Sequence, residues 1–289
     1  MRFHNRLVAT LLVLLLAGCS STTFVYNRLD FIIPWYVGKY VDLDRAQKKQ
    51  LDELLIPFLQ WHRREELPAY LEWVERLEPQ LEKPLTPQQL AAAGEQIQQA
   101  WTRIEARGLE WMITLGETLS DEQLAGFMDE LWEKQQEYEE EDLARDDAEY
   151  REEARENLEE QIEDFLGQIN DSQEAMLDKA TARLWRADKT WLQERARWLE
   201  RLGQVLQRQP GWQDELRRAV TLRENYNSEA YLATYEHNAS VLYAVIAEVL
   251  NSRTADQDRH LRRELESLQE DLTTLRDDRR LAPENTPPG

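Results

Sequence analysis

The stretch LWRADKTWLQERARWLERLGQVL, residues 184–206, decides the fold. Apolar residues recur in it as pairs every seven positions, with Leu202 between: Leu184-Trp185, Trp191-Leu192, Trp198-Leu199 and Val205-Leu206. A repeat of this length places the apolar side chains along one edge of a helix, as in bundles and coiled coils. A second stripe, with the 3.6-residue period of a helix, runs through residues 101–115. These patterns predict an all-α fold.

Five positions carry the sequence of a helix N-terminus. Each has a short polar cap residue and a glutamine three residues later: Asp44 and Gln47, Thr86 and Gln89, Ser120 and Gln123, Asn170 and Gln173, Thr254 and Gln257. The cap side chain can accept a hydrogen bond from a free amide of the first turn, and the glutamine can reach back to the cap amide. We therefore expect an elongated bundle or array of about eight helices. The expected helices span residues 44–66, 68–82, 86–116, 120–167, 170–208, 212–225, 228–251 and 254–277.

Prolines should interrupt this pattern at defined places. Pro57 and Pro68 are expected to kink or break the first helical region, because proline lacks the amide hydrogen that a helix interior needs. Pro210-Gly211 predicts a turn. Residues 279–289 are rich in proline and are expected to form a disordered tail.

Composition excludes several classes of protein. The 289 residues carry 35 Lys and Arg against 56 Asp and Glu, a formal net charge of -21. This balance makes nucleic acid an unsuitable partner, since phosphate binding needs a basic face. The hydrophobic content of 42% is too high for an intrinsically disordered chain. A single cysteine excludes a disulfide framework.

The N-terminus has the layout of a secretory signal. A basic stretch, residues 2–6, precedes an apolar run over residues 7–16 that is too short to span a bilayer. The run ends in Leu16-Ala17-Gly18-Cys19, which resembles a bacterial lipobox. That resemblance implies cleavage between Gly18 and Cys19 and attachment of a diacylglycerol to the Cys19 thiol. The alternative is a generic signal peptide with a chance cysteine.

The residue after the cysteine indicates which membrane would hold the lipoprotein. Ser20, rather than aspartate, follows Cys19, and by resemblance to Gram-negative lipoproteins this favours the outer membrane. The expected organisation is a signal peptide over 1–18, a lipidated tether over 19–23, a helical periplasmic domain over 24–278 and the tail over 279–289.

Two stretches allow two interpretations each. Residues 24–41 are the most aromatic part of the mature chain and would either lie in the core or face the membrane, where Trp and Tyr favour the lipid interface. Residues 129–164 are densely acidic and would form either one long solvated helix with a thin buried edge or a face for cationic partners.

The search for chemistry yields one candidate polar cluster. His62, Arg63, Glu66 and Tyr70 fall close together, with His62 and Glu66 one helical turn apart. We expect a partly buried structural histidine rather than a catalytic one. No catalytic, cofactor-binding or metal-binding residue is predicted, since the histidines lack ligand spacing and no phosphate loop is present. The tryptophans could line a sugar or peptide groove, but their helical stripes favour core packing.

Two families share motifs with this chain. The segment Leu55–Leu71, with Trp-His-Arg followed by Glu-Leu-Pro, resembles the signature of a family of uncharacterised proteobacterial lipoproteins, a domain of unknown function. Leu85-Thr86 with Gln89 and Leu119-Ser120 with Gln123 are similar to the paired motifs of Spy and CpxP type periplasmic proteins. Those proteins are helical dimeric cradles for unfolded clients. This chain is longer and acidic where such cradles are basic, so only the helix-start role transfers.

The resulting expectation is a non-catalytic lipoprotein on the periplasmic face of the outer membrane. It would bind or scaffold protein partners of the cell envelope, with chaperone-like action as one form. An enzyme acting on cell-wall polymer and an accessory subunit of an envelope assembly are the alternatives. The membrane is contacted through the lipid anchor, no cofactor is expected, and the oligomeric state is not predicted.

Overall fold

The computed structural model describes residues 21–278, and within this range every regular element is a helix. The all-α prediction is therefore confirmed. The predicted signal peptide, the cleavage site with Gly18 and Cys19, and the tail over 279–289 lie outside the described residues.

The chain order is a series of α-helices with three short irregular helices between them. The elements are α2 (Ser21–Tyr26), α3 (Leu29–Val37), α4 (Arg45–Trp61), a π-helical segment (His62–Glu66), α5 (Leu67–Leu77), a 3₁₀ turn (Glu78–Glu82), α6 (Pro87–Gly116), α7 (Asp121–Ala144), α8 (Asp147–Leu166), α9 (Asp171–Thr181), α10 (Asp188–Val205), α11 (Trp212–Thr221), a 3₁₀ turn (Arg223–Tyr226), α12 (Glu229–Asn251) and α13 (Ala255–Asp277).

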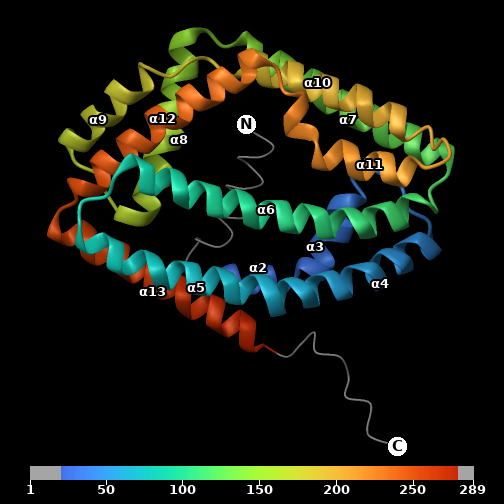
Figure 1. Cartoon of the computed structure of the whole chain (residues 1–289), viewed down its shortest axis with the longest axis horizontal. Coiled ribbons are helices and arrows are strands. Elements are labelled where there is room, and N and C mark those ends of the chain that lie inside the picture. Colours follow the sequence, from blue (N-terminus) through green and yellow to red (C-terminus); the bar gives the residue numbers. More distant parts are fainter. Residues whose placement is uncertain (1–20, 279–289) are drawn as a thin grey trace, which may run out of the picture.

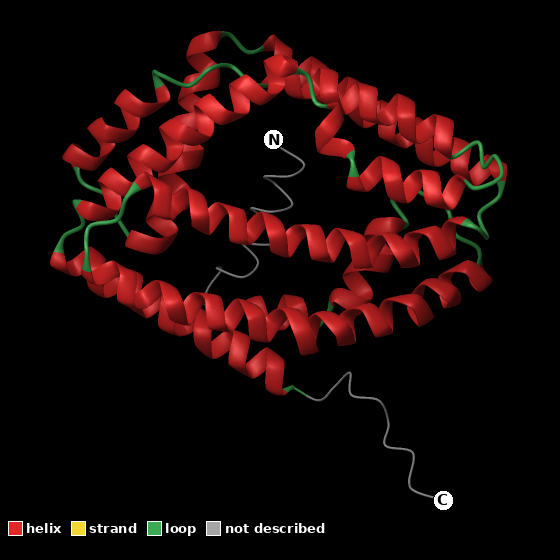
Figure 2. Ribbon diagram, viewed as in Figure 1, coloured by secondary structure: helices red, strands yellow, loops and turns green. Residues whose placement is uncertain are grey.

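These helices are laid out in an oval outline (Figure 1). α4, the π segment and α5 follow one long side, and α6 runs back beside them. α7 and α10 form a second close pair, as do α5 and α13. Figure 2 shows that loops gather where the helices end, at the left, right and top of the outline. The fold is a chain of helix pairs, because consecutive long helices return on one another.

All five predicted capping boxes are present in the structure. In each box the cap side chain accepts a hydrogen bond from the backbone amide of its glutamine, and the glutamine side chain accepts one from the backbone amide of the cap residue. The cap residues are Asp44, Thr86, Ser120, Asn170 and Thr254. A sixth box, formed by Asp146 and Glu149, was not predicted. The cap interaction spans only three residues, which is why the sequence alone locates these starts.

Four of the capping glutamines also join helix starts that are distant in sequence. Gln47 and Gln123 exchange amide hydrogen bonds of 3.0 and 2.8 Å, and Gln173 and Gln257 do the same at 3.0 and 2.8 Å. The first pair ties the start of α4 to that of α7, and the second ties α9 to α13. In Figure 1 α4 and α7 start at one end of the oval, and α9 and α13 start at the other. Because the amides satisfy one another, these polar groups can be buried at low cost.

The buried apolar side chains form three separate clusters. The largest is built from α5, α8, α9, α12 and α13. The second joins Leu51 and Leu55 of α4 to Leu115 of α6. The third joins the end of α6 to the end of α10 and to α11 through Ile113, Val205 and Trp212. The body is therefore held together in sections around the oval rather than by one central core.

The predicted number of about eight helices is too low. Residues 120–167 form two helices, because Asp146 caps a new N-terminus just after α7 ends at Ala144. Residues 170–208 also split, since 182–187 are not helical and α10 begins only at Asp188. α2 begins at Ser21, inside the expected tether 19–23, and extends into residues 24–41, which were given no helix in the expected list and which also contain α3.

Proline acts at Pro68 rather than at Pro57. Pro57 lies inside α4 without ending it, on the exposed side, where water can replace the missing hydrogen bond. Pro68 stands in the first turn of α5, and the five residues His62–Glu66 before it form the π-helical segment. Pro68 has no amide hydrogen to donate to the carbonyl four residues earlier. The helix before it forms a hydrogen bond over five residues instead of four, from the Leu67 amide to the His62 carbonyl.

Candidate functional site

The structure brings the predicted polar cluster together in and beside the π-helical segment. His62, Arg63 and Glu66 are buried, and Tyr70 is half-buried one turn further on. Short π-helical stretches are frequent at functional sites. The cluster therefore warrants a residue-by-residue account.

His62 is held between two tyrosines. Its Nδ1 lies 2.9 Å from the hydroxyl of Tyr26, and its Nε2 lies 3.5 Å from the hydroxyl of Tyr70. Burial lowers the pKa of His62 to about 4, although the neighbouring Glu66 carboxylate opposes that shift. Burial also raises the pKa of both tyrosines. At neutral pH the ring is uncharged, with one nitrogen donating and the other accepting.

Glu66 and Arg63 are each committed to partners outside the segment. Glu66 accepts two parallel hydrogen bonds of 2.8 Å from the guanidinium of Arg103 on α6. Arg63 donates to the carbonyls of Leu275 and Asp278 at 3.0 and 3.2 Å and so caps the end of α13. These contacts join the π segment to two other helices.

Arg63 also contacts α2 and the residue that follows it. It donates to Asn27 Oδ1 at 2.8 Å and lies over the ring of Tyr26, 5.1 Å from its centre. Thr23 in turn donates to the buried carboxylate of Asp271 on α13 at 3.0 Å. We call this set of contacts between α2, the π segment and α13 the N-terminal junction. It fixes α2 against the body by polar contacts on two sides.

Of this junction the sequence predicted only His62 and Arg63. Thr23, Tyr26, Asn27, Asp271 and Asp278 were not predicted, because they lie 36 to 248 residues from their partners. No local pattern distinguishes them from other polar residues of a helix. The predicted members were found because they share one helical turn.

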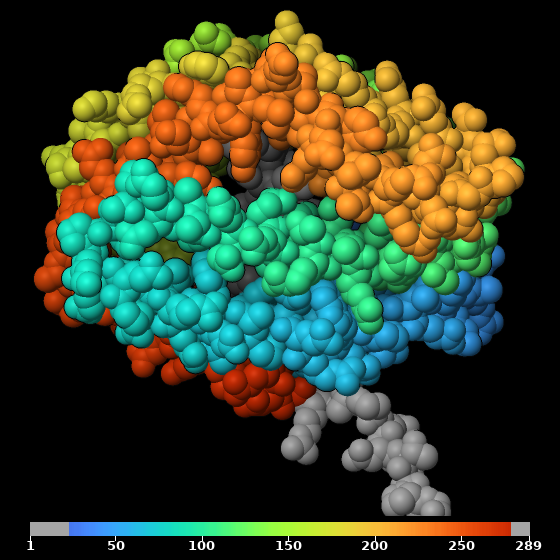
Figure 3. All heavy atoms as spheres, viewed as in Figure 1, coloured from blue at the N-terminus to red at the C-terminus, as the bar shows by residue number. Residues whose placement is uncertain are grey.

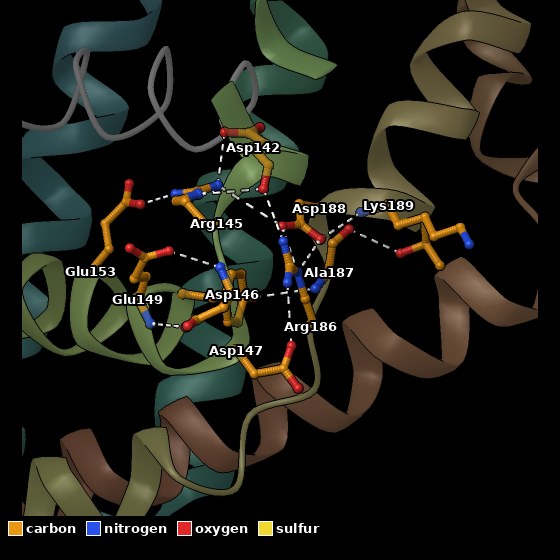
Figure 4. A network of polar contacts seen from close by, with 12 residues as sticks. Asp142, Arg145, Asp146, Asp147, Glu149, Glu153, Arg186, Ala187, Asp188 and Lys189 are labelled. Carbon is orange, nitrogen blue, oxygen red and sulfur yellow. Dashed lines mark hydrogen bonds and ion pairs between the residues drawn. The ribbon is translucent and has the colours of Figure 1, made fainter. Parts of the chain in front are cut away.

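A second polar network lies where α7, α8 and α10 meet. Figure 4 shows Arg145 and Arg186 among carboxylates from all three elements. Arg145 pairs with Asp142 at 2.7 Å and also with Glu153, and Arg186 pairs with Asp188 at 2.9 Å. Asp142 and Asp188 are buried. Within the acidic stretch 129–164 the expected buried edge is present at Leu158 and Ile162, but the expectation of one long helix is wrong, because the stretch divides into α7 and α8.

The aromatic stretch after the tether is only partly packed. Ile33 and Val37 lie against the cluster around Leu51 and Leu55, and Tyr26 lies in the N-terminal junction. On the other side Phe24, Phe31 and Trp35 are 57%, 69% and 56% exposed. The stretch has a core side and a free side.

A second set of exposed apolar side chains lies between residues 185 and 235. It consists of Trp185, Leu222, Tyr226, Leu232 and Tyr235, which we call the partner face. Trp185 stacks on His237 of α12, with 4.1 Å between ring centres. In Figure 3 the orange region that contains α11 and α12 lies on the side turned to the viewer, whereas α2 and α3 lie behind α4, α5 and α6 in Figure 1.

Other features of the described residues fit a site less well. An open groove between α5 and α13 is lined by Leu71, Glu75, Glu266 and Glu270 among others, but no tryptophan lines it. Within residues 21–278 no cluster of three or more histidine, aspartate or glutamate side chains is arranged to hold a metal ion. In the same range no helix is both long and apolar enough to cross a bilayer.

The comparison with protein families matches the resemblance found in the Leu55–Leu71 segment. A model described as a family of unknown function, DUF6279, matches residues 39–232. The chain belongs to this family. The match runs from just before α4 into the start of α12 and includes the π segment and the second polar network. No curated protein and no solved structure matches the chain.

Proposed function

We propose that this protein is a non-catalytic lipoprotein of the outer membrane that binds or scaffolds protein partners in the periplasm. The observation that carries the proposal is the partner face. Large apolar side chains that stay exposed together mark interaction surfaces, and aromatic residues are enriched at protein interfaces. Tyr226 is 51% exposed and Trp185 50%, although both are aromatic.

The polar cluster supports a binding role rather than catalysis. Both ring nitrogens of His62 face tyrosine hydroxyls, and both oxygens of Glu66 accept from Arg103. A general base needs a free site within hydrogen-bond reach of a substrate proton. Here these side chains are used to join helices.

The lipid anchor is proposed from the sequence. Cys19 stands two residues before α2, at the lipobox position, and acyl chains bind a bilayer by about 0.8 kcal/mol per buried methylene. Cys19→Ala should therefore release the protein from the membrane or leave an unprocessed precursor. Fractionation of the variant with the membrane as a mature lipoprotein would contradict the anchor.

The partner face can be tested by crosslinking in intact cells. A photo-crosslinking amino acid is placed at Tyr226 or at Tyr235, and a matched control is placed at Leu143, an exposed apolar residue of α7. Mass spectrometry should identify the same envelope protein from both test positions and not from Leu143. Capture of nothing but lipid and abundant neighbouring porins would contradict the proposal.

The number of captured proteins and their folding state distinguish two kinds of binding. One stoichiometric partner that co-purifies would indicate an accessory subunit of an envelope assembly. Many partially unfolded proteins, together with suppression of their aggregation, would indicate chaperone-like action.

A further inference from the structure

The free side of α2 and α3 carries a regular row of aromatic and basic residues. It consists of Phe24, Arg28, Phe31, Trp35 and Lys39, spaced three or four residues apart, and we call it the N-terminal stripe. All five are exposed. The two cations lie over aromatic rings: Arg28 is 4.4 Å from the centre of the Phe24 ring, and Lys39 Nζ is 3.9 Å from that of Trp35.

The body holds this stripe in a fixed orientation. Ile33 and Val37, on the opposite side of α3, pack against the apolar cluster of α4 and α6. Tyr26 and Thr23 are tied to the π segment and α13 through the N-terminal junction. Since the inner side is occupied by these contacts, the stripe cannot turn into the core without breaking them.

The length of chain before α2 limits what can cover the stripe. Only Ser20 separates the lipidation position Cys19 from Ser21, where α2 begins. Two residues span at most about 7 Å even when fully extended. If acyl chains on Cys19 enter a bilayer, α2 must begin at the headgroups of that bilayer.

We propose that the N-terminal stripe lies in the headgroup region of the bilayer that holds Cys19, and that it sets the orientation of the helical body on the membrane. This inference rests on the proposed lipid anchor. Aromatic rings favour the membrane interface, and the cations can reach lipid phosphates while their stems cover the rings. They also offset locally the repulsion between anionic lipid and a chain of net charge -21.

The stripe lies in the interface and does not cross the membrane. α3 is nine residues long, and none of its residues is buried in the body. A helix of this length cannot span a hydrocarbon core, but it can lie along its surface. The partner face belongs to other parts of the chain, between residues 185 and 235.

The decisive experiment removes the acyl chains and keeps the stripe. The mature-length chain, residues 19–289, carries Cys19→Ser and is mixed with vesicles of phosphatidylethanolamine and phosphatidylglycerol. The test variant adds Phe31→Ser and Trp35→Ser, and the matched control adds Tyr226→Ser and Tyr235→Ser from the partner face. We expect the parent chain and the control to float with the vesicles and the test variant to bind more than about tenfold more weakly.

A second measurement reports the position of the stripe directly. Because Cys19 is the only cysteine of the chain, Cys19→Ser leaves a background in which Phe31→Cys or Tyr226→Cys can be labelled alone with an environment-sensitive fluorophore. Vesicles should shift the emission of the label at position 31 to shorter wavelength and leave the label at position 226 unchanged. Circular dichroism should show the same thermal unfolding for all these variants, since every changed side chain is exposed.

Two results would overturn the inference. One is equal flotation of the test variant and its parent, and the other is an unchanged emission at position 31 in the presence of vesicles. Failure of the anchor itself is a separate outcome, because it is measured with intact Cys19 by membrane fractionation. The stripe variants with intact Cys19 should stay in the membrane fraction whether or not the stripe binds lipid.

Discussion

Two of the buried polar networks within residues 21–278 stabilise their arginines in different ways. In the N-terminal junction the buried Arg63 faces mainly neutral oxygens, from two carbonyls and one amide, with the Asp278 carboxylate at 3.6 Å. In the α7–α8–α10 network Arg145 and Arg186 each face several carboxylates. The first network depends on exact fit, because little opposite charge compensates the guanidinium. In the second network opposite charges balance, and each arginine has more than one carboxylate partner.

This difference matches the position of each network in the chain. The junction joins segments up to 248 residues apart and fixes the helix next to the proposed anchor. The α7–α8–α10 network offsets the repulsion within the most acidic part of the chain, where Asp142 and Asp188 are buried. We therefore expect the junction to be the more sensitive of the two to the loss of its arginine.

The largest effect is expected from Arg63→Ala. Removing this buried guanidinium takes the donor from two backbone carbonyls and from Asn27 Oδ1, and should lower the free energy of unfolding by roughly 3–5 kcal/mol. Urea denaturation at neutral pH measures the change. Arg64→Ala is the matched control, since Arg64 is the exposed neighbour in the same π segment. Equal stability of the two variants would refute the role assigned to Arg63.

The second prediction concerns pH. The pKa of His62 is about 4 in the folded state and near 6.5 in the unfolded chain, so between these values only the unfolded chain binds the proton. The stabilisation from His62 is fully present above pH 6.5 and is lost as the pH falls toward 4. The loss amounts to about 3 kcal/mol, at about 1.4 kcal/mol per pKa unit.

His62→Gln supplies the comparison for this pH effect. Glutamine keeps hydrogen-bonding groups but does not titrate in this range. Urea denaturation at several pH values should show a weaker pH dependence for the variant than for the parent. The opposing titration of Asp271, whose pKa burial raises, is present in both chains and cancels in the difference. Identical pH dependence would show that His62 does not titrate as the structure implies.

A smaller and salt-dependent loss is expected from Arg145→Ala. Asp142 loses its 2.7 Å partner, but Arg186 stays beside it and donates to the Asp142 carbonyl at 2.9 Å. The free energy of unfolding should fall by about 1–2 kcal/mol, and less at high salt, because Arg145 and Glu153 are 19% and 31% exposed and water and ions reach this side of the network. Arg151→Ala, at an exposed position of α8, is the control. A loss as large as that of Arg63→Ala would remove the distinction between the two networks.

The neutral glutamine pairs should give the smallest effect. Gln173→Ala removes the two hydrogen bonds with the buried amide of Gln257, which keeps its bond to the Gln168 carbonyl, and should cost about 1 kcal/mol, with no dependence on salt. Gln89→Ala removes only an exposed capping contact and should cost less. Urea titrations of both variants at low and high salt measure these values. A salt-dependent loss at Gln173 would contradict a purely neutral contact.

The sequence by itself determined the fold class, the five predicted helix starts and the polar residues of the π segment. Each of these depends on interactions within about one helical turn, such as that between Thr86 and Gln89, or on a period that runs along one helix. The family was also visible in the Leu55–Leu71 signature.

Tertiary structure decided where long helices break and what the polar residues contact. The helix expected over residues 120–167 ends at Ala144, and Asp146 caps a new helix. Between them the Arg145 side chain contacts buried carboxylates of α7 and α10. The partners of His62 and Arg63 come from both ends of the described chain. Such contacts depend on how helices return on one another in space, and no local pattern in the sequence encodes that distance.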